Sequence, residues 1–334
     1  MKRLEETWYQ SKLSWNILLW PFEWLFCRLA QWQKTKQLKR QWRAPCPVII
    51  VGNISVGGTG KSPLTIALIE ILQQRGYKVG VVSRGYGAKR ADFPYQVRAT
   101  DNDQQSPDEP LMIVQRTGVS LVIDPNRVRA CQFLLANNEC NLIISDDGLQ
   151  HYRLGRDIEI AVIDGARGLG NRHCLPVGPL REKPSRLQSV DHVVVNGDSE
   201  VDYPHQTNMQ LAPMGWYRVC DDQFIGLDAF SKLSNDCEIH AFAGIGNPQR
   251  FYDTLSTLGI ESVEHSFVDH HQYSALDFAF FGQTSTAIVC MTQKDAVKCK
   301  NVAPENSYYL KIAAKLEDEF IDQLTLGITR ILKR

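Results

Sequence analysis

The chain has 334 residues, enough for one large domain or two ordinary ones with a substantial buried core. Apolar residues make up 43% and charged residues 22%, a composition that excludes a disordered chain and a membrane protein with many spans. Lysine plus arginine equals aspartate plus glutamate, so the overall charge gives no indication of a nucleic-acid partner.

The first 43 residues differ from the rest. They contain six of the seven tryptophans, with nine basic and three acidic side chains, a net charge of +6. The apolar run at residues 15–26 is interrupted by Glu23 and followed by Arg28, so it lacks the roughly 18 continuous apolar residues that a span requires. A signal peptide is not expected either, because no small-residue cleavage site follows.

Tryptophan prefers the membrane–water interface, and lysine and arginine are attracted to anionic lipid. These residues together predict a helix that lies in the membrane surface and is entered or interrupted at Pro21. The alternative is an aromatic helix that packs on the protein's own core or forms a dimer interface.

The nine cysteines are scattered, with no CxxC pair and no metal-binding spacing. This pattern indicates reduced cytosolic thiols that serve as small apolar residues.

Residues 46–87 contain the most informative motif. Residues 48–51 are a short apolar run typical of a buried strand, residues 64–74 have apolar side chains at helical spacing, and residues 78–83 form a second strand-like run. The loop SVGGTGKS stands between the first strand and the helix. The segment therefore predicts a βαβ unit with a phosphate-binding loop.

The loop's composition suits phosphate. Its glycines let backbone N–H groups turn toward phosphate oxygens, and the helix N-terminus adds its positive dipole end. We expect Lys61 to reach the β- and γ-phosphates of ATP, and the Ser62 hydroxyl to bind Mg²⁺. Ser55 departs from the usual pattern, which has glycine at this position. The predicted nucleotide-binding residues are Ser55, Val56, Gly57, Gly58, Thr59, Gly60, Lys61 and Ser62.

A second apolar strand, within residues 141–154, ends in Asp146 and Asp147. Carboxylates at the end of a strand beside a phosphate loop can hold Mg²⁺ directly or through water. The alternative is a turn with two solvated aspartates. His151 could orient a carboxylate or cap the turn, and the sequence does not decide between them.

For several other charged residues the sequence is compatible with more than one role. Asp108 and Glu109 stand at an expected helix start, where the local pattern favours capping. A strand at residues 158–165 ends in Asp164 and leads into a loop rich in glycine, proline and arginine. The loop's basic residues could meet an anionic substrate or be solvated; they are Arg172, Arg181, Lys183 and Arg186.

The second half continues the alternation of strands and helices. Residues 192–197 predict a further strand of the first domain, and residues 209–220 a two-stranded connection around a PMG turn. Residues 238–260 predict another strand–loop–helix unit, whose GIGN loop lacks the full GxGxxG and so indicates no second nucleotide site. Residues 286–298 begin with a strand, and residues 308–334 predict a strand and an amphipathic helix.

Asp269, His270 and His271 fall in one expected loop, and Lys294 and Asp295 follow a strand. Because no third well-spaced ligand accompanies the histidines, a metal site is disfavoured. A histidine that assists a carboxylate base is the preferred interpretation.

Eight motifs occur in order across residues 51–298: SVGGTGKS, VVSRGYG, DEP, DDGLQH, LPVGPLRE, AGIGNPQRF, VDHHQYS and TQKDAVK. In these motifs the chain resembles the tetraacyldisaccharide 4′-kinases, the lipid A 4′-kinases of Gram-negative bacteria. The aromatic, basic N-terminus is similar to that of the family, which works at the cytoplasmic face of the inner membrane. The resemblance implies transfer of the ATP γ-phosphate to the 4′-hydroxyl of a tetraacyldisaccharide 1-phosphate in lipid A biosynthesis.

The resemblance also implies residue roles. Asp108 of the DEP motif would act with His270 of the second domain to orient and deprotonate the sugar hydroxyl. His271 stands where the family's motif is variable, so no role is carried to it.

On the nucleotide side, Asp146 and Asp147 match the family's acidic pair near magnesium. Asp146 is expected to be a metal ligand together with Ser62, and Asp147 to belong to the catalytic set with Lys61. Ser55 is no anomaly within the family, whose loop commonly starts with serine.

The expected fold is α/β: a P-loop NTPase-like, mostly parallel sheet with helices on both faces, plus a smaller C-terminal α/β domain and an N-terminal interfacial helix. We place the membrane-associating segment at residues 1–43, the kinase domain at 44–225 and the C-terminal domain at 226–334. Closure of the two domains on ATP, Mg²⁺ and lipid is expected.

The expected partners are the acylated disaccharide 1-phosphate and the inner-membrane surface, reached as a peripheral or monotopic protein, without nucleic acid or an obligate protein partner. The rival interpretation is a peripheral membrane ATPase that acts as a switch for a protein partner, and a soluble small-molecule kinase is a third. Acyl-chain preference, oligomeric state, the depth of insertion and which of Asp146 and Asp147 contacts the metal directly are not predictable from the sequence.

Overall fold

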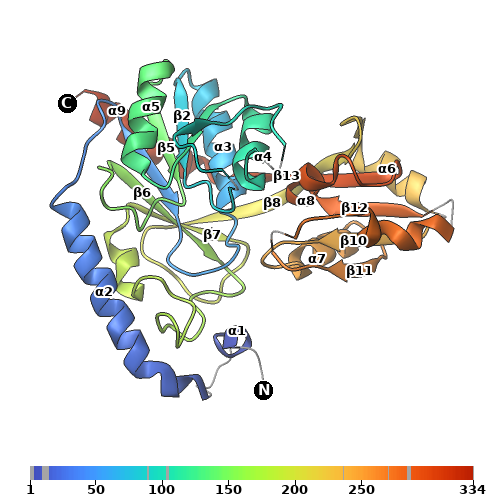
Figure 1. Ribbon diagram of the computed structural model, residues 1–334, viewed down its shortest axis with the longest axis horizontal. Coiled ribbons are helices and arrows are strands. Elements are labelled where there is room, and N and C mark those ends of the chain that lie inside the picture. The colour runs from blue at the N-terminus through green and yellow to red at the C-terminus, as the bar shows by residue number, and fades with distance from the viewer. Residues whose placement is uncertain are drawn as a thin grey trace.

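The computed structural model describes residues 4–9, 15–88, 90–102, 105–235, 237–269, 271–283 and 287–333. Within these segments, thirteen strands form one sheet that continues from a larger lobe into a smaller one (Figure 1). Most neighbouring strands in it are parallel, as the sequence predicts.

Seven strands form the core of the larger lobe: β1 Val48–Gly52, β2 Val79–Ser83, β3 Tyr95–Gln96, β4 Ser120–Ile123, β5 Leu142–Asp146, β6 Ile158–Asp164 and β7 His192–Asn196. β1 lies between β5 and β6 and pairs in parallel with both. The central strands are nearly continuous apolar runs because helices cover both faces of the sheet. The carboxyl ends of β1, β2 and β5 therefore meet at one edge, where a ligand site is expected.

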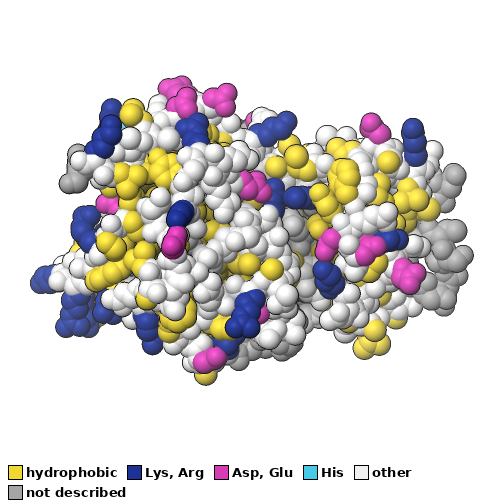
Figure 2. All heavy atoms as spheres, turned by 90° about the horizontal axis from the view of Figure 1, so that it is seen from above, with side chains coloured by type: hydrophobic (Ala, Val, Ile, Leu, Met, Phe, Trp, Pro, Cys, Tyr) yellow, Lys and Arg dark blue, Asp and Glu magenta, His cyan; other side chains and the backbone are white. Residues whose placement is uncertain are grey.

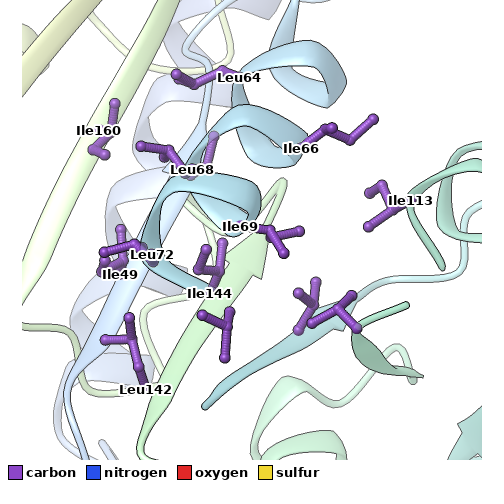
Figure 3. Packing of buried hydrophobic residues seen from close by; sticks show 14 of the residues in the cluster. Ile49, Leu64, Ile66, Leu68, Ile69, Leu72, Ile113, Leu142, Ile144 and Ile160 are labelled. Atoms are coloured by element: carbon purple, nitrogen blue, oxygen red, sulfur yellow. The ribbon is translucent and has the colours of Figure 1, made fainter. Parts of the chain in front are cut away.

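The helices that cover this sheet are α3 Lys61–Gln74, α4 Asp108–Thr117 and α5 Arg127–Asn137. On one face, Leu64, Leu68 and Leu72 of α3 pack against Ile49 and Ile144 of the strands (Figure 3). α4 packs on the same face, and α5 packs on the other one. Helices on both faces confirm the predicted fold class.

Two long strands join the lobes. β8 Gln206–Arg218 and β13 Ser307–Leu316 are antiparallel and pair along most of their length. The prediction of a two-stranded connection around the PMG turn is therefore wrong. Gly215 takes a φ of 146°, and the register shifts between Lys311 and Ile312, so a bulge absorbs the irregularity and the strand continues.

The smaller lobe contains β9 Phe224–Ile225, α6 Leu227–Ser234, β10 Ile239–Ala243, α7 Gln249–Thr257, β11 Val263–Ser266, η3 Ala275–Gln283, β12 Ile288–Thr292 and α8 Gln293–Cys299. The larger lobe also contains η2 Pro184–Ser189, and α9 Asp318–Leu332 ends the chain. The predicted strand–loop–helix unit is present as β10 and α7. After β13, α9 returns to the larger lobe, where Phe320 packs edge-on against His192. The predicted domain boundaries stay a prediction, and the helical end of the chain lies with the first lobe.

The N-terminal segment contains α1 Leu4–Thr7, η1 Trp15–Leu19 and α2 Trp20–Leu38, and α2 runs along the outside of the larger lobe (Figure 1). Pro21 stands in the first turn of α2, where a missing N–H costs nothing, so the helix is entered there and not interrupted. No helix among the described residues is both long and apolar enough to cross a bilayer.

The tryptophans of this segment divide into two groups. Trp8 is buried and donates its indole N–H to the carbonyl of Pro176 at 3.1 Å, as the core-packing alternative predicts for it. Trp20, Trp24 and Trp32 on α2 are 58%, 62% and 63% exposed. Lys and Arg side chains also gather at the end of the molecule along which α2 lies (Figure 2).

Candidate functional site

A cavity of about 1670 Å³ lies where the two lobes and α2 meet. The first lobe contributes the loop before α3, the start of α4 and the turn after β5; the second lobe contributes the loop after β10 and the start of α8. α2 lines the remaining side with residues that include Trp24 and Lys34. The predicted phosphate loop therefore shares one cavity with Asp108, Asp146 and Asp147.

The phosphate loop is shaped by glycine. Gly57 and Gly60 have φ values of 98° and 94°, in the region that L side chains rarely adopt. A Cβ added to Gly60 would lie 2.3 Å from Nδ2 of Asn196, the amide that donates to the carbonyl of Thr59 at 3.1 Å. Asn196, at the end of β7, therefore packs against the loop and fixes its backbone through this hydrogen bond. Sequence reasoning did not single out Asn196.

The first two residues of the loop pair with the segment at Pro179 and Leu180. Ser55 forms an antiparallel bridge with Leu180, and the Val56 N–H donates to the carbonyl of Pro179 at 2.8 Å. This pairing gives the LPVGPLRE motif a structural role as a support for the phosphate loop. It also explains why serine is tolerated at position 55, because a residue in such a bridge needs no positive φ.

Asp146 is buried at the end of β5, where its carboxylate accepts from Thr65 Oγ1 at 3.2 Å and from Ser83 Oγ at 3.4 Å. Burial, with the negative charges of Glu109 and Asp147, raises the pKa of Asp146 to about 6. A carboxylate in such a place is stabilised by a cation. The alternative of two solvated aspartates therefore does not hold for Asp146.

Asp147 has a φ of 48° and turns its carboxylate toward the phosphate loop. It lies 3.7 Å from Lys61 Nζ and 3.4 Å from Arg181 Nη1. Burial opposes its ionisation, but the charges of Lys61, Arg181 and Arg127 hold the pKa of Asp147 below its usual value. A left-handed non-glycine residue in such a turn is a common mark of a functional site.

Arg127, which sequence reasoning missed, fixes this turn. Its buried guanidinium donates to the backbone carbonyls of Asp124 at 3.1 Å and Asp146 at 3.0 Å. Burial lowers its pKa to about 10, which still leaves it charged at neutral pH. The sequence held no sign of this role, because an arginine at a helix start is usually solvated.

The His151 Nε2 accepts from the Arg127 N–H at the start of α5, at 3.3 Å. The histidine therefore caps a neighbouring helix. Burial and the nearby arginines lower the pKa of His151 to about 4.

This cap makes the fold sensitive to acid. His151 binds fewer protons in the folded chain than in the unfolded chain, so its contribution is present above pH 6.5 and is lost as the pH falls toward 4. We expect this group to lower the unfolding free energy by about 2 kcal/mol between pH 8 and pH 5. In His151→Asn, which keeps an acceptor but cannot titrate, urea unfolding should show that much less pH dependence. The exposed His205→Asn is the control, and identical pH profiles for wild type and His151→Asn would contradict this role.

The start of α4 meets α8 of the smaller lobe. Asp108 is buried, and its Oδ1 accepts from the Glu109 N–H at 3.0 Å, so it does support the helix start. Lys294 Nζ lies 2.9 Å from Glu109, 3.1 Å from Asp269 and 3.9 Å from Asp108. Lys298 Nζ, almost fully buried, lies 4.0 Å from Asp108. Two cations from one lobe therefore face the predicted base of the other.

His270 lies outside the described residues, so its predicted approach to Asp108 stays a prediction. Its described neighbour Asp269 contacts Lys294 and lines the cavity. On its other side, His271 Nε2 lies 3.3 Å from Asp277 Oδ1.

The loop after β10 approaches the phosphate loop closely. A Cβ added to Gly246 would lie 2.9 Å from the Gly58 N–H nitrogen, and Arg167 Nη2 donates to the Gly246 carbonyl at 3.0 Å. Arg250 Nη2 donates to the Asn196 carbonyl at 2.8 Å. The GIGN motif is therefore a contact between lobes, and Arg250 is a second lining residue that sequence reasoning missed.

The basic loop is only partly at the site. Arg181, Lys183 and Arg186 line the cavity, whereas Arg172 is not among the lining residues. Arg186 is buried and donates to Glu159 at 2.5 Å, so its charge serves the fold. Of the four predicted anion contacts, only Arg181 and Lys183 lie at the cavity without such a buried partner.

The chain is similar to known proteins along almost its whole length. The sequence model of the family described as LpxK, tetraacyldisaccharide-1-P 4′-kinase, matches residues 15–328. A tetraacyldisaccharide 4′-kinase of Ectopseudomonas mendocina is 47% identical over 99% of this chain and 98% of its own, and one of Azotobacter vinelandii is 46% identical over the same shares. LpxK of Aquifex aeolicus, solved in complex with ATP, is 27% identical, with a TM-score of 0.76 over 95% of this chain and 99% of its own. The chain therefore belongs to the tetraacyldisaccharide 4′-kinase family.

Proposed function

We propose that this chain transfers the γ-phosphate of ATP to the 4′-hydroxyl of a tetraacyldisaccharide 1-phosphate. The observation that carries the proposal is that one cavity is lined by the phosphate loop, by Asp108 and by α2. The donor, the base and the membrane-facing helix therefore border the same space. The kinase names of the relatives and the ATP complex of the Aquifex aeolicus protein support the assignment of donor and acceptor.

The residues of the loop fit a nucleotide with a divalent cation. The positive φ values of Gly57 and Gly60 leave backbone N–H groups free of any Cβ, as a phosphate cradle requires. Ser62 and Asp146 would hold Mg²⁺, which when bound offsets the negative charge of the phosphates. Lys61 then stabilises charge on the transferring group, and Asp147 orients Lys61 through their ion pair.

On the acceptor side, Asp108 would accept the proton of the sugar hydroxyl, and His270 would orient the same hydroxyl. Lys294 and Lys298 lie 3.9 Å and 4.0 Å from the Asp108 carboxylate, and Lys298 also pairs with Asp295 at 3.0 Å. These lysines come from α8, so the base is complete only when the lobes are together. We therefore propose that lobe closure is a step of the reaction and that the chain divides near residue 226.

We further propose that α2 places the enzyme at the cytoplasmic face of the inner membrane. The exposed rings of Trp20, Trp24 and Trp32 suit the interface, and basic side chains follow them along the helix. Confinement to the surface that holds the lipid raises its effective concentration at the cavity.

Substitution of these three tryptophans by serine is expected to weaken binding to anionic vesicles by at least about tenfold, because each ring loses on the order of 1 kcal/mol of interfacial burial. Vesicle sedimentation measures this. Leu276→Ser, which changes an exposed apolar residue of the smaller lobe, is the control and should bind like the wild type. Unchanged sedimentation of the triple variant would rule out α2 as the membrane contact.

The experiment for the function is to incubate the protein with γ-labelled ATP and the disaccharide lipid. Label on the lipid supports the kinase. Hydrolysis without lipid labelling, stimulated only by an added protein, would support the membrane ATPase switch instead.

A further inference from the structure

A second cluster of ligand-type side chains lies outside the phosphate site, where α2 crosses the loop at residues 171–180. The thiol sulfurs of Cys27 and Cys174 and a carboxylate oxygen of Glu23 all lie within 4.8 Å of one another. Cys174 is buried, and Cys27 and Cys174 are both reduced. These residues are far apart in sequence, which is why cysteine spacing alone gave no metal motif.

α2 and the loop at residues 171–180 each supply two side chains to this cluster. Glu23 and Cys27 are four residues apart on α2 and so lie on one face of the helix. His173 and Cys174 are adjacent on the loop. The Glu23 carboxylate joins the pairs: it lies 2.9 Å from His173 Nδ1 and accepts from the Cys174 N–H at 2.7 Å.

We propose that Glu23, Cys27 and Cys174 bind a Zn²⁺ ion, with His173 as the hydrogen-bond partner that orients Glu23. Zinc prefers thiolate, carboxylate and imidazole ligands at about 2.0–2.3 Å in a tetrahedron, and ligand atoms of such a shell are less than 4.8 Å apart. A ligating carboxylate held by a histidine is a usual outer shell. Mg²⁺ is excluded by the two sulfurs, because it takes oxygen ligands.

Charge and access both favour a cation. Binding converts the two thiols to thiolates and releases their two protons to solvent, so the ion replaces protons among three groups that otherwise repel one another when ionised. Cys27 and Cys174 line the large cavity, which gives the ion a path to the site.

The ion would link the membrane helix to the phosphate loop. Cys174 is bridged to Leu180, which is itself bridged to Ser55 at the start of the phosphate loop. A metal at Cys174 therefore fixes α2 against the segment that supports the nucleotide site. The inferred role is structural, since no reacting atom is near it in this assignment.

The test uses the full-length, tag-free protein, stripped of metal and kept reduced. Titration with Cd²⁺ is followed by thiolate-to-metal absorption in the ultraviolet, and Zn²⁺ affinity is measured by competition with a chromophoric chelator. We expect one ion per chain, with affinity reduced at least about 100-fold in Cys27→Ser and Cys174→Ser. Cys220→Ser, which removes an exposed cysteine, should bind like the wild type.

Two further readouts keep the result decisive. If a serine variant unfolds, Glu23→Gln should still weaken Zn²⁺ binding while the metal-free Tm shows that it is folded. In the wild type, Zn²⁺ should raise Tm and protect α2 from protease, because a ligand of the folded state stabilises it. Absence of stoichiometric binding, or equal binding by wild type and the Cys27, Cys174 and Glu23 variants, would overturn the site.

Discussion

Asp108→Asn is expected to bind ATP about as tightly as the wild type and to lose roughly 10²–10⁴-fold in turnover with the lipid acceptor. The amide is isosteric and can still accept from the Glu109 N–H, so the start of α4 is preserved. It cannot take a proton, however, and it loses the attraction of Lys294 and Lys298. Single-turnover transfer and nucleotide titration measure the two quantities separately.

The matched control is Asp322→Asn, which removes an exposed carboxylate of α9 far from the cavity. It should leave both turnover and ATP affinity unchanged. Turnover of Asp108→Asn near the wild-type rate would rule out Asp108 as the base, whatever its effect on the fold.

Gly60→Ala is expected to reduce nucleotide affinity at least about 100-fold, which corresponds to about 2.7 kcal/mol. The new Cβ would overlap the Asn196 amide and would sit on a backbone with φ of 94°, so the loop must shift away from its cradle geometry. Isothermal titration with ATP measures the loss. Thermal unfolding should change less, because the loop lies outside the hydrophobic core.

Gly226→Ala provides the comparison, because a Cβ there has nothing within 4 Å and the residue does not have a positive φ. It should bind ATP like the wild type. If Gly60→Ala also bound ATP normally, the phosphate would not be held by this loop in the way proposed.

The parts of the fold that could be predicted from sequence are the local ones. β1, the phosphate loop, α3 and β2 follow one another within residues 46–87, and each is marked by apolar periodicity or by glycine. The path of β8 was missed because a glycine-containing bulge has the same composition as a turn. Only pairing with β13, which is distant in sequence, distinguishes the two.

The site residues also fall into those that the sequence could predict and those that it could not. Lys61 and the aspartates at the end of β5 could be found because their positions are tied to a strand end beside the loop. Asn196, Arg127 and Arg250 could not, because their role is to donate to backbone carbonyls contributed by distant segments. Such contacts impose no spacing on the sequence. The cysteine cluster at α2 is hidden for the same reason.

The exposed tryptophans show a different limit. Composition indicated an interfacial helix for the whole segment, yet Trp8 is buried against the larger lobe while Trp24 is exposed. Composition indicates only the average environment of a segment. Whether each tryptophan ring is buried or exposed depends on its contacts in the folded chain.

The most direct measurement is a single-turnover transfer assay with γ-labelled ATP and two acceptors, tetraacyldisaccharide 1-phosphate and its 4′-deoxy analogue, on anionic vesicles. We expect rapid labelling of the first lipid at its 4′ position, no labelling of the analogue, and slow labelling of the first lipid by Asp108→Asn. Equal labelling of the two acceptors, or label found only as inorganic phosphate, would contradict the proposed reaction.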